Sequence, residues 1–384
     1  MLDRCLRWAK INSGTANLEG LAEQASELAD AFSVLPGDVE MVDPARVTAV
    51  AEDGSQYEKP HGRHLVVRVR PDAERRLLLT GHMDTVFAAD HPFQDIAWLD
   101  DDTVNGPGTA DMKGGLSLIL EALLAFERSS EAAQCGYDVM INSDEETGSL
   151  SSAALIEELA RGKYAALTYE PSALPDGTLA HVRGGSGNYS ITFSGRSAHA
   201  GRNPQNGRNA LVAAADCAVR LKQMQHRDLP TNPAKIDGGA ANNVVPDHAV
   251  LRFNIRPKTQ DAAEAFQSDL KDLLQLLEKH HEVLIHCHGG ITRPPKPVDE
   301  RAQKLFDLVR DTGEALGQQI GWQATGGVCD GNNIAACGIP VVDTMGVRGG
   351  AIHSPKEFMI VPSLTEKAAL SAVVLHRLAT GAVL

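Results

Sequence analysis

Short apolar runs alternate with helical periodicity along the first part of the chain. The segments HLVVRVR (64–70), RLLLTGH (76–82) and YDVMIN (137–142) are short and apolar, which is typical of buried strands. Between the second and the third lies GGLSLILEALLAF (114–126), whose apolar residues recur at helical spacing. Strand and helix signals that alternate in this way predict an α/β fold with a mainly parallel sheet flanked by helices.

The pattern changes in the middle of the chain. GNYSITFSG (187–195) and HAVLRFNI (248–255) alternate apolar with polar residues, as antiparallel strands with one buried face do. Each is followed by a long helical pattern, at 206–224 and at 261–281. These segments predict a compact α+β unit in which two helices cover an antiparallel sheet.

A proline-rich stretch, TRPPKPVDE (292–300), ends this middle part, and the α/β rhythm resumes beyond it. We therefore expect one main domain that is interrupted by an inserted domain. The predicted boundaries place the first part of the main domain at 1–184, the inserted domain at 185–296 and the second part of the main domain at 297–384.

Composition narrows the class of protein. The 384 residues are 43% hydrophobic, which supports a packed globular protein, and the length favours two domains. The net charge of −14 argues against a nucleic-acid partner, which would require a basic surface. No run approaches the ~18 apolar residues of a membrane span, and the start of the chain lacks the apolar core of a signal peptide. We therefore expect no membrane association and a cytoplasmic protein, in which the six cysteines are reduced.

Histidines and acidic residues collect where the predicted strands end, which is where sites form in α/β sheets. The candidates are His82, Asp84, Asp111, Asp144, Glu145, Glu146, Glu170 and His353. Two zinc ions that share a bridging carboxylate need about two histidines and three carboxylates, and this set provides them. Taken singly, each residue has an ordinary alternative, such as a turn after a strand, a solvated acidic loop or a partly buried loop histidine.

Two of these groups have a spacing that suits a metal site. Asp84 follows His82 by two residues, so both side chains point to the same side of an extended segment. A metal-bound histidine needs its other ring nitrogen held, usually by a carboxylate. The three acids at 144–146 follow the apolar DVMIN, and adjacent carboxylates repel each other unless cations neutralise them. We therefore expect one glutamate there to bind metal while its neighbour moves protons.

Six motifs in order along the chain resemble those of one enzyme family: TGHMDTVF, GPGTADMKGG, DEETGS, YEPS, SGRSAHAG and IHS. It is the dinuclear zinc metallopeptidase and deacylase family that contains glutamate carboxypeptidase (carboxypeptidase G), acetylornithine deacetylase and succinyl-diaminopimelate desuccinylase. The resemblance covers nearly the whole chain, and the 25-residue step from Glu145 to Glu170 is most similar to the glutamate carboxypeptidase branch. It implies a zinc-peptidase-like catalytic domain with an inserted lid and dimerisation domain.

The resemblance also implies two Zn²⁺ ions, for which Co²⁺ or Mn²⁺ can substitute. The implied ligands are His82, Asp111 and Glu170 for one ion and Asp111, Glu146 and His353 for the other. Asp111 would bridge the two ions, Glu145 would be the general base, and Asp84 would orient His82. Where the family often has a second aspartate, this chain has Met112, and the Asp111–Met112 peptide bond is expected to be cis.

Further matches to the family imply substrate contacts. His199 in SAHAG matches a histidine that reaches into the partner subunit's site of a homodimer and steadies the oxyanion. Asn243 and Arg256 match substrate-contacting lid positions, and Arg183 is a weaker match. Gly327 lies in TGGVCDGNNIA, which matches a loop that helps to bind the substrate's terminal carboxylate. A structural histidine, a surface arginine and a plain turn are the ordinary alternatives for His199, Arg256 and this loop.

The predicted function is therefore a dinuclear-zinc amide hydrolase that acts on a small peptide or an N-acyl amino acid. The first prediction is a glutamate carboxypeptidase-like metallopeptidase that cleaves next to a free carboxylate. An N-acyl amino acid deacylase of the acetylornithine deacetylase or desuccinylase type is the alternative, because it too cuts an amide next to a carboxylate. A non-catalytic metal-binding protein of the same fold is a remote alternative, which loss of a ligand or of the base would mark.

Overall fold

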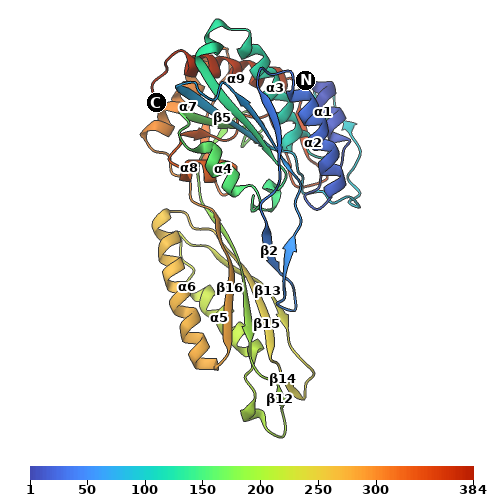
Figure 1. The fold of residues 1–384 in the computed structure, drawn as a ribbon, viewed down its shortest axis with the longest axis vertical. Helices are drawn as coiled ribbons and strands as arrows, with labels where there is room; N and C mark the ends of the chain where they lie inside the picture. Colours follow the sequence, from blue (N-terminus) through green and yellow to red (C-terminus); the bar gives the residue numbers. More distant parts are fainter. The chain divides into compact units, whose positions relative to one another are not determined.

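The computed structural model describes residues 1–384, which divide into two compact units (Figure 1). The first unit consists of Met1–Ala45, Pro60–Arg183 and Pro297–Leu384, and the second of Arg46–Lys59 and Gly184–Lys296. Each unit has its own hydrophobic core. Residues 46–59, which the sequence placed in the main domain, belong to the second unit, and this part of the prediction was wrong.

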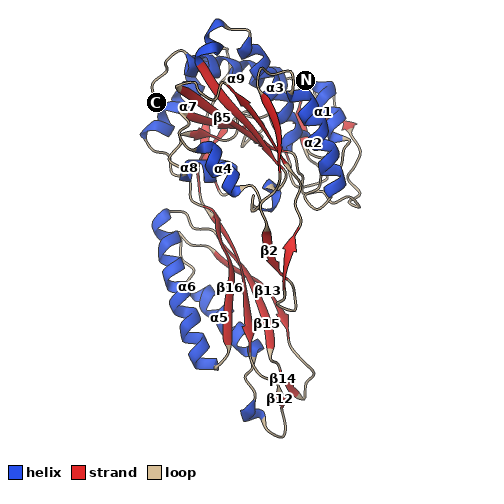
Figure 2. Cartoon of the chain, in the orientation of Figure 1, coloured by secondary structure: helices blue, strands red, loops and turns tan.

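A six-stranded sheet forms the centre of the first unit (Figure 2). In spatial order its strands are β1 (Asp38–Val42), β4 (His64–Val69), β8 (Cys135–Asn142), β5 (Arg75–His82), β9 (Ala165–Thr168) and β18 (Val341–Val342). The last four run parallel to one another, whereas β1 and β4 form antiparallel pairs. The predicted α/β fold with a mainly parallel sheet is confirmed.

Helices cover both faces of this sheet, because its central strands are apolar on both sides. Along β5, Leu77 and Leu79 face the larger core, whereas Leu78 faces a second cluster on the other side. The larger core packs against α1 (Leu2–Ala9), α2 (Leu18–Phe32), α3 (Gly114–Glu127), α7 (Glu300–Ala315) and α9 (Ser363–Ala379). The second cluster packs against α4 (Ala153–Ala160) and α8 (Asp330–Ala336).

The register of the parallel strands brings three chain segments together at one edge of the sheet. His82 pairs with Asn142 of β8, and Thr80 pairs with Thr168 of β9. The residues that follow these strands, including Glu145 and Glu170, therefore begin at the same edge as His82. This is the carboxyl edge, where α/β sheets form their sites.

Smaller sheets complete the first unit. One of four strands has the order β19 (Gly349–Gly350), β20 (Phe358–Ile360), β7 (Thr103–Asn105) and β6 (Ala97–Trp98). The loop that carries His353 connects β19 to β20 within this sheet. In another, β10 (Leu179–Arg183) pairs in parallel with β17 (Trp322–Thr325).

The second unit is built on an antiparallel sheet of four strands. Their order is β13 (Thr231–Gly238), β15 (His248–Ile255), β11 (Ser186–Ser194) and β16 (Leu284–Arg293). The helices α5 (Ala210–Gln223) and α6 (Gln260–His281) pack on one face, where Ile191, Leu251 and Phe253 belong to the core. The inserted α+β architecture is thus as predicted. A two-stranded sheet of β12 (Ala198–His199) and β14 (Val244–Val245) carries His199.

A hairpin of β2 (Val47–Val50) and β3 (Gln56–Lys59) also belongs to the second unit. Arg252 donates to the carbonyl of Val50 at 3.0 Å, and His288 Nε2 lies 2.8 Å from the carbonyl oxygen of Thr48. Arg252 alternates along β15 with the core residues Leu251 and Phe253, so the hairpin contacts the face opposite the helices.

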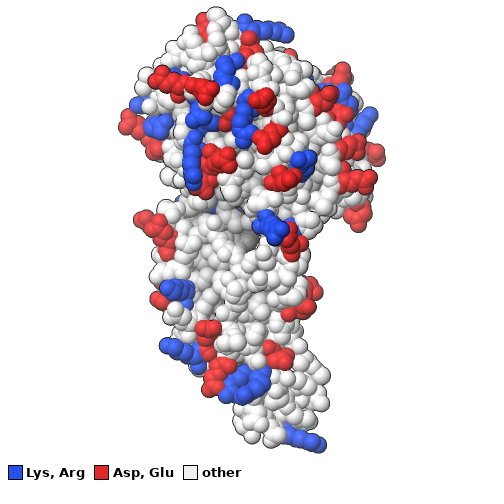
Figure 3. Space-filling model, viewed as in Figure 1, with Lys and Arg blue, Asp and Glu red and all other residues white.

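On the face drawn in Figure 3, basic side chains are interspersed with acidic ones and do not form a continuous patch. None of the helices combines the length and the apolar character that are needed to cross a lipid bilayer.

Candidate metal centre

His82, the last residue of β5, is held on both ring nitrogens. Its Nδ1 lies 2.9 Å from the backbone carbonyl oxygen of Asp84, and its Nε2 lies 3.0 Å from Oδ1 of Asp111. Its backbone N–H donates to the sulfur of Met112 at 3.2 Å. Burial alone would lower the pKa of His82, but the charge of Glu170 and the contacts with Asp111 and Asp84 raise it well above its ordinary value. The ring therefore lies in a strongly negative field.

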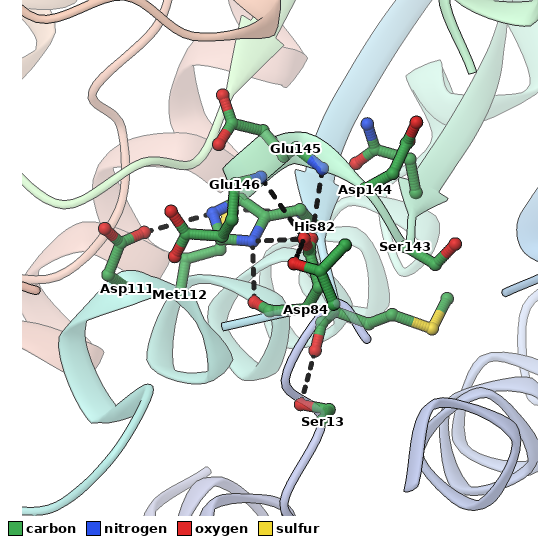
Figure 4. Close-up of polar contacts among 12 residues, drawn as sticks. Ser13, His82, Asp84, Asp111, Met112, Ser143, Asp144, Glu145 and Glu146 are labelled. Atoms are coloured by element: carbon green, nitrogen blue, oxygen red, sulfur yellow. Dashed lines mark hydrogen bonds and ion pairs between the residues drawn. The ribbon is translucent and has the colours of Figure 1, made fainter. Parts of the chain in front are cut away.

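The Asp84 carboxylate contacts other groups besides His82. Its Oδ1 is 3.4 Å from His82 Nδ1, so the backbone carbonyl makes the closer contact with the ring. The carboxylate accepts the backbone N–H groups of Glu145 at 3.1 Å and Glu146 at 3.2 Å, and the Thr15 hydroxyl at 2.7 Å. Figure 4 shows the contacts of Asp84 with Glu145 and Glu146, with the His82 ring between Asp84 and Asp111. Asp84 thus ties β5 to the turn that carries two candidate glutamates.

Asp111 lies between two histidines. Its Oδ1 faces His82 Nε2 at 3.0 Å, and its Oδ2 faces His353 Nε2 at 3.3 Å. The side chain is buried, and although burial would raise its pKa, the hydrogen bonds from His353 and His82 lower it. It stands in the turn Thr109–Lys113, and the Asp111–Met112 peptide bond is cis, as expected. One carboxylate therefore presents a separate oxygen to each imidazole.

Glu146 and His353 form the other side of the cluster. His353 Nε2 is 3.2 Å from Oε2 of Glu146. Burial and the charge of Asp111 raise the pKa of Glu146 to about 7, and the hydrogen bonds to Asp111 and Glu146 raise the pKa of His353 to about 11. The His353 side chain is 53% exposed and its φ is +62°. The exposure of His353 makes this side of the cluster open to solvent.

Glu170 lies beside His82, as the strand register requires. Its Oε2 is 3.7 Å from His82 Nε2. Its Oε1 is buried and has no hydrogen-bond partner. Burial and the charge of Asp111 favour a raised pKa for Glu170, which the nearby His82 only partly offsets. A cation beside His82 would satisfy this oxygen, because a buried carboxylate oxygen without a partner is costly.

The donor set fits divalent metal ions. Two groups of side chains each bring their ligand atoms within 4.8 Å of one another: His82 with Glu145 and Glu170, and His82 with Asp111 and Glu146. Imidazole nitrogens and carboxylate oxygens are the ligands of zinc sites with an open position. The same set also suits other first-row divalent metals.

A cavity of about 430 Å³ opens beside this cluster within the first unit. Its lining includes Asp111, Glu145, Glu146, Glu170 and His353, and also Arg183 and Gly327. Arg183 is buried and makes a bidentate ion pair with Asp343, at 2.8 and 3.1 Å, and it donates to the carbonyl of Gly327 at 2.9 Å. The structure thus brings Arg183 and Gly327 together with the candidate ligands.

The remaining predicted site residues belong to the second unit and are exposed. Asn243 and Arg256 are both on its surface, and Arg256 donates to the side chain of Asn254 at 2.9 Å. His199 Nδ1 accepts the backbone N–H groups of Gly201 at 3.0 Å and Arg202 at 3.1 Å. In a neutral ring the proton of His199 is therefore on Nε2, which points away from these contacts.

Sequence reasoning missed two residues that hold the cluster together. Thr15 donates to Asp84, and Glu357 accepts backbone N–H groups of the turn that carries Asp111. Asp144 was a candidate site residue in the sequence. It is buried and accepts hydrogen bonds from Ser151 and Ser152, which fixes the turn before Glu145. The serines in GSLSS and the glutamate four residues after His353 were the available signals.

The fold and this arrangement define an α/β metallohydrolase with candidate imidazole and carboxylate ligands at the carboxyl edge of its sheet. The model of peptidase family M20/M25/M40 matches residues 78–377, so the chain belongs to this family of metal-binding hydrolases. The predicted family, which includes metallopeptidases and deacylases, is confirmed.

Two curated relatives belong to different branches of the family. Carboxypeptidase G2 of Pseudomonas sp. (strain RS-16) is 29% identical over 331 residues, which cover 83% of this chain and 78% of the relative. A succinyl-diaminopimelate desuccinylase of Psychromonas ingrahamii is 25% identical over 291 residues, which cover 72% of this chain and 75% of the relative. Among solved structures, a tripeptidase from Staphylococcus aureus superposes with a TM-score of 0.73 over 99% of this chain and 98% of that one, at 23% identity, and it shows the shared fold.

Proposed function

We propose that this chain is a dinuclear zinc amide hydrolase that cleaves a peptide or N-acyl bond next to a free carboxylate. One observation carries the proposal: the two oxygens of Asp111 face two different histidines, at 3.0 and 3.3 Å. A single metal ion would not require a carboxylate that is divided in this way. Glu170 stands on the His82 side and Glu146 on the His353 side, so each half has one further carboxylate.

The proposed ligands are His82, Asp111 and Glu170 for one ion and Asp111, Glu146 and His353 for the other. When bound, two zinc ions would supply Lewis acidity at the amide carbonyl and lower the pKa of an attacking water. Co²⁺ or Mn²⁺ would suit the same donor set.

Glu145 is the proposed general base. It lines the cavity and shares its turn with Glu146, and its carboxylate lies within 4.8 Å of the ligand atoms of His82 and Glu170. Glu145 would accept the proton of the attacking water and return it to the leaving nitrogen, so that one carboxylate serves first as base and then as acid.

The substrate's carboxylate requires basic or N–H groups beside this cavity. Arg183 and Gly327 line it, although the ion pair with Asp343 already occupies two of the guanidinium nitrogens of Arg183. Arg183 would therefore act mainly by fixing the loop of Gly327 and by its positive charge.

The second unit would complete the site in a homodimer, as the lid and dimerisation domain. His199 presents an Nε2–H that can donate to an oxyanion, because its Nδ1 already accepts two backbone N–H groups. Asn243 and Arg256 would contact the substrate from the same unit. Sedimentation at working concentrations tests this assembly, and mixing His199→Ala chains with Glu145→Gln chains should restore activity if His199 acts across the dimer.

An N-acyl amino acid deacylase is the second candidate function. The similarity to the succinyl-diaminopimelate desuccinylase supports it, whereas the higher identity to carboxypeptidase G2 favours the peptidase. Both reactions cut an amide next to a carboxylate, and none of the proposed ligands or the base is missing, which counts against a non-catalytic protein.

A hydrolysis screen on zinc-loaded protein tests the proposal. The panel should contain N-acyl-glutamates, dipeptides, tripeptides, acetylornithine and succinyl-diaminopimelate, with Glu145→Gln as the control for contaminating hydrolases. Turnover of peptidyl or acyl glutamates above the control would support the peptidase, and turnover of acetylornithine or succinyl-diaminopimelate alone would support the deacylase. Zinc-loaded protein that binds two equivalents but hydrolyses no amide on the panel would contradict both.

A further inference from the structure

Glu357 is a buried carboxylate that contacts the chain just before Asp111. The residue is 1% exposed, and its Oε1 accepts the backbone N–H groups of Ala110 and Asp111, each at 3.0 Å. The backbone N–H of Gly108 is a third hydrogen-bond donor to the same side chain. One carboxylate thus serves as the acceptor for a whole turn of backbone.

The turn needs such an acceptor because it is buried and irregular. Gly108 has φ +70°, a left-handed conformation that suits glycine, and Ala110 and Asp111 are buried. Other bonds of the turn run from Thr109 N–H to Gly106 and from Lys113 N–H to Gly108. Buried N–H groups without an acceptor are rare in folded proteins, since each would cost about 1–3 kcal/mol. Without Glu357 the turn would have to rearrange, and Asp111 would move with it.

The segment that carries Glu357 is itself fixed. The N–H of Glu357 donates to Ser354 at 3.0 Å, and Asn105 donates from its side chain to the carbonyl of Glu357 at 2.6 Å. The next residue, Phe358, begins β20 and pairs with Asn105 of β7. His353 lies four residues before Glu357 on the same segment. One short segment therefore carries a histidine of the cluster and also holds the backbone of Asp111.

The position of Glu357 is unfavourable for a carboxylate that had no further role. The Glu357 side chain is buried, and the turn that it holds carries a second carboxylate, that of Asp111. A neutral side chain of similar size would avoid the repulsion between the two carboxylates. A neutral apolar side chain has no oxygen at this position and could not accept the two backbone N–H groups.

We propose that Glu357 is a positioning residue that sets the place of the Asp111 carboxylate through its backbone, and thereby the spacing of the two metal ions. This inference rests on the proposed function of Asp111 as a bridging ligand. Glu357 is not one of the proposed ligands and does not line the cavity, and it acts by holding the 108–111 turn. Residues that orient metal ligands typically change metal affinity or activity by about 10–100-fold when they are replaced.

A matched pair of variants separates position from charge. Glu357→Gln keeps an oxygen at the same distance from the backbone and loses the charge, whereas Glu357→Asp keeps the charge and withdraws the oxygen by one methylene. Metal affinity is measured by competition with a chelator, and kcat and KM are measured on the zinc-loaded enzymes. We expect Glu357→Asp to lose about 10–100-fold in metal affinity, with kcat falling more than KM rises, and Glu357→Gln to stay closer to the wild type.

A second readout does not depend on metal. In metal-free protein, hydrogen exchange of the Ala110 and Asp111 amides should accelerate in Glu357→Asp and remain protected in Glu357→Gln. Asp138→Asn is the control for general destabilisation, because it weakens the buried pair with Lys163 without contact to this turn. It should lower the thermal midpoint and leave exchange at residues 110 and 111, relative to the rest of the unit, unchanged.

The outcomes are distinguishable. If Glu357→Asp keeps its metal affinity and amide protection while Glu357→Gln loses them, the charge matters and the positioning role is overturned. Equal behaviour of both variants and the wild type would overturn it as well. A wild-type protein that retains no metal under any condition would instead overturn the proposed function, and amide exchange would still decide whether Glu357 holds the turn.

Discussion

The two halves of the candidate metal centre are built differently. The His82 half is enclosed: the imidazole side chain is 1% exposed, and the chain holds both of its ring nitrogens. The His353 half is open: its imidazole side chain is 53% exposed and contacts only Asp111 and Glu146 among the acidic side chains. Asp111 joins the two halves with one oxygen in each.

If the centre binds two ions, this difference would let one be held tightly while the other stays accessible. A ligand at the end of a buried strand is positioned by the sheet, whereas a ligand in an exposed loop is positioned mainly by what it binds. We therefore expect the His82 half to hold its ion more tightly and the His353 half to exchange its ion and admit substrate.

Replacing Asp111 should remove metal binding from both halves, because each half uses one of its two oxygens. In Asp111→Ala we expect loss of both metal equivalents and a fall in kcat/KM beyond the roughly 10²–10⁴-fold that a general base contributes. Metal content after gel filtration and hydrolysis rates measure the two effects. A variant that still holds one equivalent as tightly as the wild type would show that Asp111 serves only one half.

Replacing Glu145 should leave both halves intact and stop the chemistry. Glu145→Gln removes the base but not a proposed ligand, so we expect kcat to fall by about 10²–10⁴-fold while two metal equivalents remain. Metal analysis and kcat should be measured on the same preparation. Near-normal turnover would exclude Glu145 as the base, and loss of one equivalent would make it a ligand instead.

Replacing the two histidines one at a time should have unequal effects on stability. His82→Ala leaves Glu170 buried without its partner and Asp111 with His353 alone, which we expect to cost about 3–5 kcal/mol in the unfolding free energy of metal-free protein. His353→Ala also removes a partner of two buried carboxylates, but this ring is 53% exposed and water can take its place, so we expect a smaller loss than for His82→Ala. Urea denaturation with and without chelator measures both. Equal losses would mean that the difference in burial has no energetic consequence.

Replacing Asp84 should weaken metal binding in both halves, by a similar amount in each and by less than the replacement of Asp111. Its backbone and carboxylate hold His82, while its carboxylate also accepts the N–H of Glu146. For Asp84→Asn we expect about 10–100-fold weaker binding of each ion, measured by chelator competition. Thr15→Val removes one hydrogen bond to the same carboxylate and is the control for a mild perturbation. A loss confined to the His82 half would contradict the link through the 145–146 turn.

Much of this site could be predicted from the sequence, because strand ends determine it. The run RLLLTGH was predicted as a strand, and β5 spans Arg75–His82. Parallel neighbours then place the residues after β8 and β9 at the same edge, so Glu145, Glu146 and Glu170 follow from the fold. Once the order of the strands is known, the candidate side chains at these positions are expected to lie close together.

Other features could not be predicted because they depend on contacts between residues far apart in sequence, and no sequence pattern marks such contacts. Glu357 bonds to backbone N–H groups almost 250 residues earlier, and any residue at 110 or 111 other than proline would provide them. The hairpin at 46–59 reads as an ordinary pair of strands, and its contacts with Arg252 and His288 lie about 200 residues or more away in sequence. The exposure of His353 depends on the loop between β19 and β20, whose path the sequence does not indicate.

The hairpin Arg46–Lys59 also determines which stretches of chain must be removed to obtain the first unit alone. Because it belongs to the second unit, that unit is assembled from two separate stretches of the chain, Arg46–Lys59 and Gly184–Lys296. Removing the longer stretch alone would leave the hairpin without the strands it contacts and would expose its inner face to water. A stand-alone first unit would therefore require two excisions, one for each stretch.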